Sequence, residues 1–356
     1  MKSTSGQYYI ALDHIRALAA LMVVSWHFLH GMTGSPVRYS YVPAIPIFSL
    51  FDEGHTGVAL FMTLSGYLFA KLLDGKRIHF GLFFYNRILR LAPLLIFTWL
   101  ALLALAYWNN MDAGPILHAI STGWISPSWP NGGWSITTEL HFYILLPMLL
   151  LGLRYSPSVP LLLILAFIFL RLGIWIIQGE AQFYSYWTII GRFDQFALGM
   201  LAYHARSWIA RKNLLAIFSL SLFCLFYYYF DGIGGFFNAP SYPSPNLLWV
   251  VMPTIEGFFY GLGIAWYAES FTFKNQGWVS KILASFGELS YSIYLLHFFF
   301  VFKVSEFVNT KIMPTSNFYL ALLWTTIFFI AMWPIAYLSH RFIEMPFLRY
   351  RKNYLK

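Results

Sequence analysis

Charged residues are scarce in this sequence. Asp, Glu, Lys and Arg make up only 10% of its 356 residues, whereas a soluble domain carries about 25%. Hydrophobic residues make up 59% and aromatic residues 21%. That content also excludes intrinsic disorder, because disordered chains have few aromatic residues and much net charge. The composition is therefore that of an integral membrane protein.

Cysteine is almost absent. Cys224 stands alone, so neither an intramolecular disulfide nor a metal site built from thiolates is expected. The net charge of +9 does not require a nucleic-acid partner, because membrane proteins concentrate Lys and Arg in their cytoplasmic loops. We expect membrane lipid, and no nucleic acid, around this chain.

Long apolar runs predict the fold class. A helix needs about 20 mostly apolar residues to cross a bilayer, and the runs predict an all-α, polytopic membrane helical bundle of about ten transmembrane helices. We expect one integral-membrane domain over residues 1–356, with no fused soluble domain. The predicted spans are Ile10–His30, Gly57–Leu73, Ile88–Trp108, Thr138–Leu151, Val159–Gln178, Thr188–His204, Leu214–Phe230, Leu247–Ala268, Leu283–Phe302 and Phe318–Leu338.

The basic residues predict the orientation. If the N-terminus is cytoplasmic, most of the 23 Lys and Arg residues fall on the cytoplasmic side, Lys2, Lys274 and Lys356 among them. This asymmetry follows the positive-inside rule and, with an even number of spans, predicts that both termini are cytoplasmic. The outer side receives only Arg38, Lys303 and Lys311.

Two ionisable residues stand out in the first predicted span. Arg16 and His27 are eleven positions apart, which is about three helical turns, so both project from the same face about 16 Å apart. Ionisable groups are costly in lipid and by default mark a functional cavity. Arg16 is predicted at the cytoplasmic mouth and His27 in the outer half. The alternative is that Arg16 is a juxtamembrane anchor and His27 an interfacial polar residue.

A second basic pair opens the third predicted span. Arg87 and Arg90 are three positions apart and share a helix face, and the planar fork of arginine suits phosphate oxygens. The pair is interpreted either as a phosphate clamp on the cytoplasmic side or as part of the positive-inside signature. The sequence alone leaves both interpretations open.

Further polar residues are predicted at mid-depth or in the outer half of the bundle. Glu139 follows a Trp-rich loop and lies on the predicted side of His27. His30 suggests a metal site, but no second pair of ligands follows at a recognisable spacing, so no metal is expected. The remaining residues are expected to converge with Glu139: Arg171, Arg192, Asp194, Glu256 and His297. The alternative for Arg171, Arg192 and Asp194 is that they form structural ion pairs between helices.

Six short motifs occur in order along nearly the whole chain. They are Leu12-Asp13-x-x-Arg16 followed by His27, Gly57 to Tyr67 with the pair Ser65-Gly66, Arg87-Ile88-Leu89-Arg90, Trp134 to Tyr143 around Glu139, Ser290 to His297, and Ile343-Glu344-Met345-Pro346. Together they resemble the integral-membrane acyltransferase family three, which includes bacterial O-antigen and exopolysaccharide O-acetyltransferases. His14 and the Met62-Thr63 pair depart from the usual pattern of that family.

The resemblance implies an acyltransferase of the bacterial inner (cytoplasmic) membrane. Such an enzyme moves an acyl group, acetyl first, from cytoplasmic acyl-CoA to a hydroxyl of an extracytoplasmic glycan or lipid-linked saccharide. Acetyl-CoA is the expected donor, and no metal is implied. The resemblance assigns Arg16, Arg87 and Arg90 to the CoA phosphates and His27 to general base catalysis, since an imidazole titrates near neutral pH.

The roles of Glu139 and Ser65 are less defined. Glu139 is expected to orient either His27 or the acceptor. Ser65 belongs with the donor site, where it either carries the acyl group or simply lies at a close helix contact. We favour direct transfer from the thioester to the acceptor hydroxyl.

Two other functions use the same residues. The first is a transporter or flippase for a lipid-linked glycan, which would consume no acyl-CoA; the absence of a clear internal repeat disfavours it. The second is a membrane scaffold without catalysis, in which Arg16, His27, Arg87 and Arg90 are incidental. The O-acetyltransferase is the function that the sequence favours.

Overall fold

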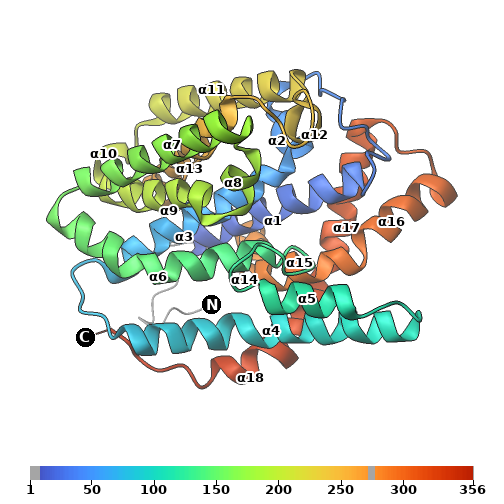
Figure 1. Cartoon of the computed structure of the whole chain (residues 1–356), viewed down its shortest axis with the longest axis horizontal. Coiled ribbons are helices and arrows are strands. Elements are labelled where there is room, and N and C mark those ends of the chain that lie inside the picture. Colours follow the sequence, from blue (N-terminus) through green and yellow to red (C-terminus); the bar gives the residue numbers. More distant parts are fainter. Residues whose placement is uncertain (1–8, 272–276, 356) are drawn as a thin grey trace.

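The computed structural model describes residues 9–271 and 277–355, which form a bundle of helices (Figure 1). Lys2, Lys274 and Lys356, counted above as cytoplasmic, lie outside the described residues. The longer helices are α1 (Ile10–His30), α3 (Gly57–Leu73), α4 (Phe80–Trp108), α5 (Gly114–Thr122), α6 (Trp134–Tyr155), α7 (Ser158–Gln178), α9 (Ile189–His204), α11 (Asn213–Gly232), α13 (Leu248–Ser270), α14 (Trp278–Glu288) and α17 (Phe318–Ser339).

Short helical segments connect these elements. They are η1 (Pro46–Phe48), α2 (Ser49–Asp52), η2 (Gly54–Thr56), α8 (Gln182–Trp187), α10 (Arg206–Ile209), α12 (Gly235–Asn238), α15 (Ser290–Leu296), η3 (His297–Phe299), α16 (Val301–Phe307), η4 (Val308–Ile312), η5 (His340–Glu344) and α18 (Met345–Leu348). Extended pairing within the described ranges is limited to one isolated bridge, between Ile78 and Leu355. The predicted all-α bundle is confirmed.

Within the described residues, eight helices are long and apolar enough to cross a membrane, and the number is nine if α14 and α15 form one span bent by 52°. The eight are α1, α3 with its preceding turn, α4, α6, α7, α11, α13 and the continuous stretch from α17 to α18. They coincide with expected spans, as does the bent pair. The chain is therefore an integral membrane protein.

The segment expected at Thr188–His204 differs from the others. It forms α9, whose 16 residues extend about 24 Å, and it carries Arg192, Asp194 and Gln195. α9 packs against α3, α7 and α13, and most of its residues are buried. Because its neighbours are helices rather than lipid, α9 needs no apolar surface. With 16 residues, α9 is also shorter than a helix that crosses a bilayer, so it is not among the candidate spans, and its crossing of the membrane stays a prediction.

α3 and α9 touch backbone to backbone. A Cβ atom added at Gly66 would lie 2.0 Å from the carbonyl oxygen of Phe196, and one at Gly199 would lie 2.0 Å from that of Thr63. Only glycine permits such an approach, as at other close crossings of membrane helices. The glycine of the Ser65-Gly66 pair is thus a helix contact, which leaves the role of the neighbouring serine to be found elsewhere.

Two of the buried arginines join helices rather than forming a site. Arg171 donates to Asp194 across 2.6 Å, and both side chains are fully buried. Arg192 donates to Gln195 across 3.1 Å, and Gln195 donates to Glu256 across 2.8 Å. These bonds tie α7, α9 and α13 together. The ion-pair interpretation of these residues is the one that the contacts support.

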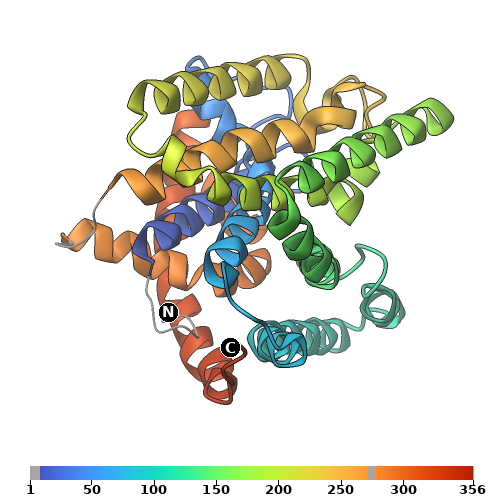
Figure 2. The same ribbon diagram turned by 90° about the vertical axis from the view of Figure 1, so that its left-hand side faces the viewer.

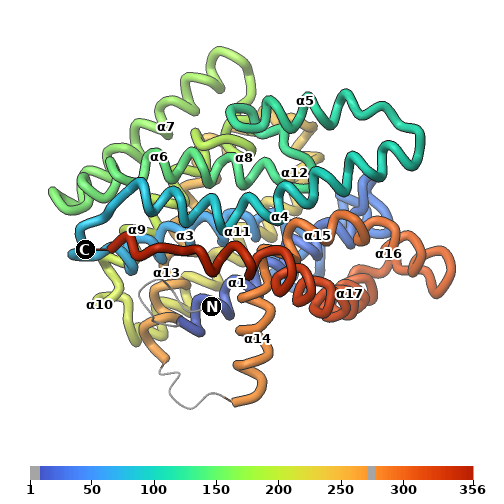
Figure 3. Tube along the Cα trace, turned by 90° about the horizontal axis from the view of Figure 1, so that it is seen from below, coloured from blue at the N-terminus to red at the C-terminus, as the bar shows by residue number. Residues whose placement is uncertain are grey.

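The C-terminal segment returns along α4. In Figure 3, α18 and the residues after it run beside α4 toward the α3–α4 connection. The side chain of Asn86 on α4 donates to the carbonyl of Lys352 across 2.7 Å and accepts from its N–H across 3.0 Å. The N–H of His79 donates to the carbonyl of Tyr354 across 2.9 Å. Figure 2 shows α4 and α5 at the periphery of the bundle, so this C-terminal segment covers an otherwise exposed helix.

Candidate active site

A long cavity runs along one face of α3. The volume open to the centres of water-sized molecules is about 190 Å³. The face is a regular helical stripe from Val58 to Leu72, which extends about 21 Å at 1.5 Å per residue. Ser65 is its one polar member; the stripe consists of Val58, Phe61, Met62, Ser65, Leu68, Phe69 and Leu72. Ser65 and Gly66 therefore have different roles, since the serine faces the cavity and the glycine faces α9.

Both ends of the described chain meet at the mouth of this cavity. Tyr9, the first described residue, and Tyr354 from the C-terminal segment both line it. The two ends therefore lie on the same side of the bundle, as expected for an even number of spans. Which side of the membrane this is stays a prediction from the basic residues.

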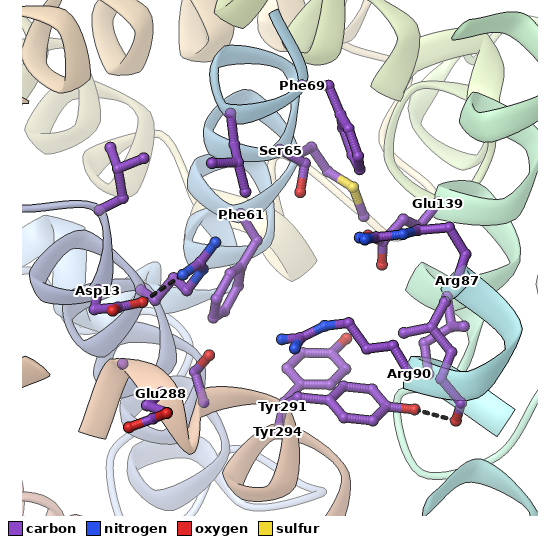
Figure 4. Close-up of a pocket in the computed structure, with 18 of the residues that line it drawn as sticks. Asp13, Phe61, Ser65, Phe69, Arg87, Arg90, Glu139, Glu288, Tyr291 and Tyr294 are labelled. Carbon is purple, nitrogen blue, oxygen red and sulfur yellow. Dashed lines mark hydrogen bonds and ion pairs between the residues drawn. The ribbon is translucent and has the colours of Figure 1, made fainter. Parts of the chain in front are cut away.

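The arginines predicted at the donor site converge on this cavity. Arg16 from α1 and Arg87 and Arg90 from α4 all line it. Figure 4 shows Arg87 and Arg90 reaching in from one wall and Asp13 on the opposite wall. Asp13 accepts a hydrogen bond from Arg16. The structure thus joins two basic groups that the sequence separates by about 70 residues.

Glu139 lies with the arginines rather than with His27. It comes from the first turns of α6 and lines the cavity, where it accepts a hydrogen bond from Tyr143. Figure 4 shows it on the same side as Arg87. Arg87 also lies 5.4 Å from the ring centres of Phe69 and Phe83, and its Nε has no hydrogen-bond partner in the described protein. An anion entering here would find a donor that the protein leaves unused.

A fourth arginine, Arg351, joins them from the C-terminal segment. Burial and, to a smaller extent, the like charges of Arg90 and Arg87 together lower the pKa of this guanidinium to about 9. Crowding of positive groups around a cavity is costly unless an anion binds among them. No local sequence pattern distinguishes Arg351, which stands in a basic run that the positive-inside rule already explains.

The cavity ends at Tyr294. Its hydroxyl donates to the carbonyl of Gly132 across 3.0 Å and accepts from Ser135 across 2.8 Å. The ring of Tyr294 also meets that of Phe61 edge to face, with centres 6.2 Å apart. Phe61, Ser135 and Tyr294 thus line the cavity where the Trp-rich loop enters α6.

His27 does not line the cavity. α1 contributes only residues up to Arg16 to the wall, because α3 then closes against α1: a Cβ at Gly57 would lie 2.5 Å from the carbonyl oxygen of Ala19. The C-terminal half of α1 is therefore separated from the cavity. The structure brings together five of the six predicted residues, namely Arg16, Ser65, Arg87, Arg90 and Glu139, and places His27 behind Tyr294.

His27 is paired with His297 instead. Nδ1 of His27 lies 3.2 Å from Nε2 of His297, and the centre of the Tyr294 ring lies 6.2 Å from that of His297. The histidine pair is therefore one aromatic ring beyond the end of the cavity. His297 is fully buried, whereas His27 is partly exposed.

The carbonyls around the pair determine where its protons lie. Nδ1 of His297 is 3.0 Å from the carbonyl oxygen of Ile293, and Nδ1 of His27 is 2.8 Å from that of Val23. Carbonyl oxygens only accept, so both rings carry their proton on Nδ1. Nε2 of His297 then accepts from His27, and Nε2 of His27 keeps its lone pair. This is the arrangement that a general base requires.

His30 has a structural role. Its two ring nitrogens lie 3.1 Å from the carbonyl oxygen of Val37 and 3.0 Å from that of Asp52. Both nitrogens are engaged, so the ring is unsuited to metal binding. Over the ranges that the structure covers, no group of three or more His, Cys, Asp or Glu residues could hold a metal ion.

The comparison with known families decides the class of the protein. Residues 9–341 match acyltransferase family 3, described as an acyltransferase domain. The chain belongs to this family. The match covers nearly the whole chain and includes every predicted site residue, so the resemblance drawn from the six motifs is confirmed. This acyltransferase-family protein carries its arginine-lined cavity within the matched region, apart from the C-terminal segment with Arg351.

One curated relative adds a narrower comparison. The chain is 29% identical over 174 residues to a protein of Bacillus subtilis (strain 168) named "Putative peptidoglycan O-acetyltransferase YrhL". The alignment covers 42% of this chain and 25% of that protein, so the chain spans about a quarter of the relative's length. No solved structure matches the chain at a significant level.

Proposed function

We propose that this protein is a membrane O-acyltransferase that moves an acyl group, acetyl first, from cytoplasmic acyl-CoA to a hydroxyl of an extracytoplasmic glycan or lipid-linked saccharide. The main observation that supports this proposal is the cavity along α3, which extends from an arginine-lined region to the neighbourhood of a histidine pair. The relative named for O-acetylation of peptidoglycan supports a glycan acceptor. In this proposal the enzyme is one domain of the bacterial inner membrane.

The donor is proposed to enter with its phosphates at the arginines. Arg16, Arg87 and Arg90 offer planar forks that match phosphate oxygens. The pantetheine arm then extends along the apolar stripe of α3, so that the thioester reaches the region of Ser135 and Tyr294. The length of the stripe, about 21 Å, suits a long and flexible arm.

The chemistry is proposed to occur at His27. Nε2 of His27 takes the proton of the acceptor hydroxyl as the oxygen attacks the thioester carbonyl. A new C–O ester bond forms, the C–S bond breaks, and the coenzyme A sulfur takes the proton back from His27. General base catalysis of this kind contributes about 100- to 10,000-fold. Tyr294 stands between the cavity and His27, so transfer requires its side chain to swing aside.

Glu139 and Ser65 are proposed to act on the donor side. Glu139 lies among the arginines and is placed to fix the position of Arg87, rather than that of His27. Ser65 has no hydrogen bond to a histidine or carboxylate in the described structure, so no base is present to activate it as a nucleophile. Direct transfer to the acceptor therefore needs fewer steps than an acyl-enzyme.

The test uses membranes that contain the protein and acetyl-CoA labelled in its acetyl group. Label should pass into the glycan fraction, and coenzyme A thiol should be released with it. His27→Ala should reduce both by at least about 100-fold, while leaving the binding of acetyl-CoA intact. Near-normal transfer by His27→Ala contradicts the assignment of the base.

The same assay separates the enzyme from a flippase for lipid-linked glycan. A flippase releases no coenzyme A thiol and carries glycan across the membrane without acetyl-CoA. If reconstituted vesicles translocate glycan equally well with and without acetyl-CoA, and no thiol appears, the acyltransferase proposal fails.

A further inference from the structure

The C-terminal segment is firmly attached to the mouth of the cavity. Asn86, which is fully buried, bonds both the carbonyl and the N–H of Lys352. Tyr354 is 1% exposed, its ring meets that of Phe83 edge to face at 5.5 Å, and its carbonyl accepts from His79. Asn86, the ring contact of Tyr354 and the Ile78–Leu355 bridge, to which the His79 bond belongs, therefore fix the residues that follow α18.

These contacts do not use the charge of Arg351. Its two neighbours in the segment, Lys352 and Tyr354, are held through backbone atoms and one buried ring. The guanidinium of Arg351 lines the cavity with Arg87 and Arg90, although Coulomb repulsion among three cations disfavours that position. Arg349, two residues earlier, is exposed and does not line the cavity. The contacts of the segment therefore hold the guanidinium of Arg351 in the cavity wall, whereas Arg349 stays outside it.

We propose that Arg351 is a donor-binding residue, through which the C-terminal segment supplies a further guanidinium to the phosphate groups of acyl-CoA and closes the mouth around them. This inference rests on the proposed function. The reason is charge balance, because coenzyme A carries several phosphate charges. Without Arg351, the cavity lining holds three carboxylates and three guanidinium groups: Asp13, Glu139 and Glu288, and Arg16, Arg87 and Arg90. Arg351 restores the excess of positive charge that a polyanion requires.

The proposal is tested with S-ethyl-CoA, a thioether that cannot transfer its group, and with S-ethylpantetheine, which lacks the phosphates. Binding to the purified full chain is measured in nanodiscs of phosphatidylcholine and of phosphatidylglycerol. Arg351→Gln should weaken S-ethyl-CoA binding by roughly tenfold, as expected for loss of a charge-assisted hydrogen bond. Binding of S-ethylpantetheine should stay within about twofold, because it has no phosphate to lose.

Two variants complete the design. Arg349→Gln removes an exposed arginine of the same segment and should bind both ligands like the unchanged protein. Arg351→Lys keeps the charge but loses the fork, so it should weaken S-ethyl-CoA binding by less than Arg351→Gln. If Arg351→Gln fails to fold, Arg351→Lys still decides the matter, since unchanged binding by that variant overturns a role that depends on the fork.

The outcomes distinguish this inference from the proposed function. If the unchanged protein binds no S-ethyl-CoA, the proposed donor is wrong. If it binds, but Arg351→Gln binds equally well, or loses both ligands equally, Arg351 has no phosphate role and the inference alone fails. A loss seen only in phosphatidylglycerol nanodiscs assigns Arg351 to a lipid headgroup and likewise overturns it.

Discussion

Nδ1 of His27 lies 2.8 Å from the carbonyl oxygen of Val23 and 3.2 Å from Nε2 of His297, so its one N–H is shared between two acceptors. The proton on Nδ1 leaves Nε2 of His27 as a lone-pair site. His297 is held in turn by the carbonyl of Ile293, so it is a positioning residue that acts through His27. A base whose tautomer is fixed in advance needs no proton rearrangement before it works.

His297→Ala should lower kcat at least tenfold and leave the KM for acetyl-CoA unchanged, because the donor cavity does not include this residue. His297→Gln offers an amide oxygen in place of Nε2 and should recover part of the loss. Steady-state kinetics of both variants provide the measurement. Equal activity of the Ala and Gln variants would show that the hydrogen bond does not matter.

Tyr294 separates the donor cavity from the histidine pair. Tyr294→Ala should remove that partition and admit water, so release of coenzyme A thiol without acceptor should rise severalfold. Ser135→Ala removes only one hydrogen bond to the same hydroxyl and serves as the matched control. Thiol release is followed in the absence of glycan, and an unchanged rate in Tyr294→Ala contradicts the placement of the partition.

The backbone contact between α3 and α9 predicts a large difference between two glycine substitutions. Gly66→Ala would place a methyl group 2.0 Å from the carbonyl oxygen of Phe196, whereas Gly263 on α13 has no neighbour within 4 Å of the added atom. Overpacking costs about 1–3 kcal/mol, and alanine in an open helical site gains up to about 1 kcal/mol. Thermal unfolding in detergent should show a clear loss of Tm for Gly66→Ala and none for Gly263→Ala.

Buried carboxyl groups near the outer end of α1 predict a dependence of stability on pH. Burial raises the pKa of Asp52, and the nearby charges of Asp231 and Glu53 raise it further. Burial also raises the pKa of Glu53 to about 8. The folded protein therefore binds more protons than the unfolded chain between about pH 4 and pH 8, so the free energy of unfolding falls as pH rises through this window.

Asp52→Asn removes one of these titrating groups and should flatten the decline. Its Tm should exceed that of the unchanged protein by a few degrees at pH 8 and by less at pH 5. Asp112→Asn, at an exposed position, should follow the unchanged protein at both pH values. A steeper decline in Asp52→Asn would show that Asp52 is ionised in the folded protein.

Much of the fold was predictable because a helix that faces lipid must be apolar over about 20 residues. α7 is apolar nearly throughout and is found where the sequence places it. α9 does not follow this pattern, because it is surrounded by other helices. Its polar residues Arg192 and Asp194 therefore do not face lipid. Composition alone cannot distinguish such a helix from a poor span.

The sequence also predicted which residue types form the donor side of the site. It did not predict how the fold brings residues from different helices together there. Arg87 and Arg90 share one helix face by spacing alone, but only the packed bundle brings Arg16 to them. The separation of His27 depends on a single close approach, that of Gly57 to Ala19. Arg351 depends on the path of the chain after its last long helix, which carries no periodic signal.

The path of that final stretch has a consequence for biosynthesis. Arg351 follows all the candidate spans found in the described residues, and it lines the cavity into which the donor is proposed to pass. A nascent chain that stops before Arg351 would contain these helices but would lack the guanidinium of Arg351 in the cavity wall. Activity should therefore require synthesis at least as far as Arg351, beyond the last of these helices.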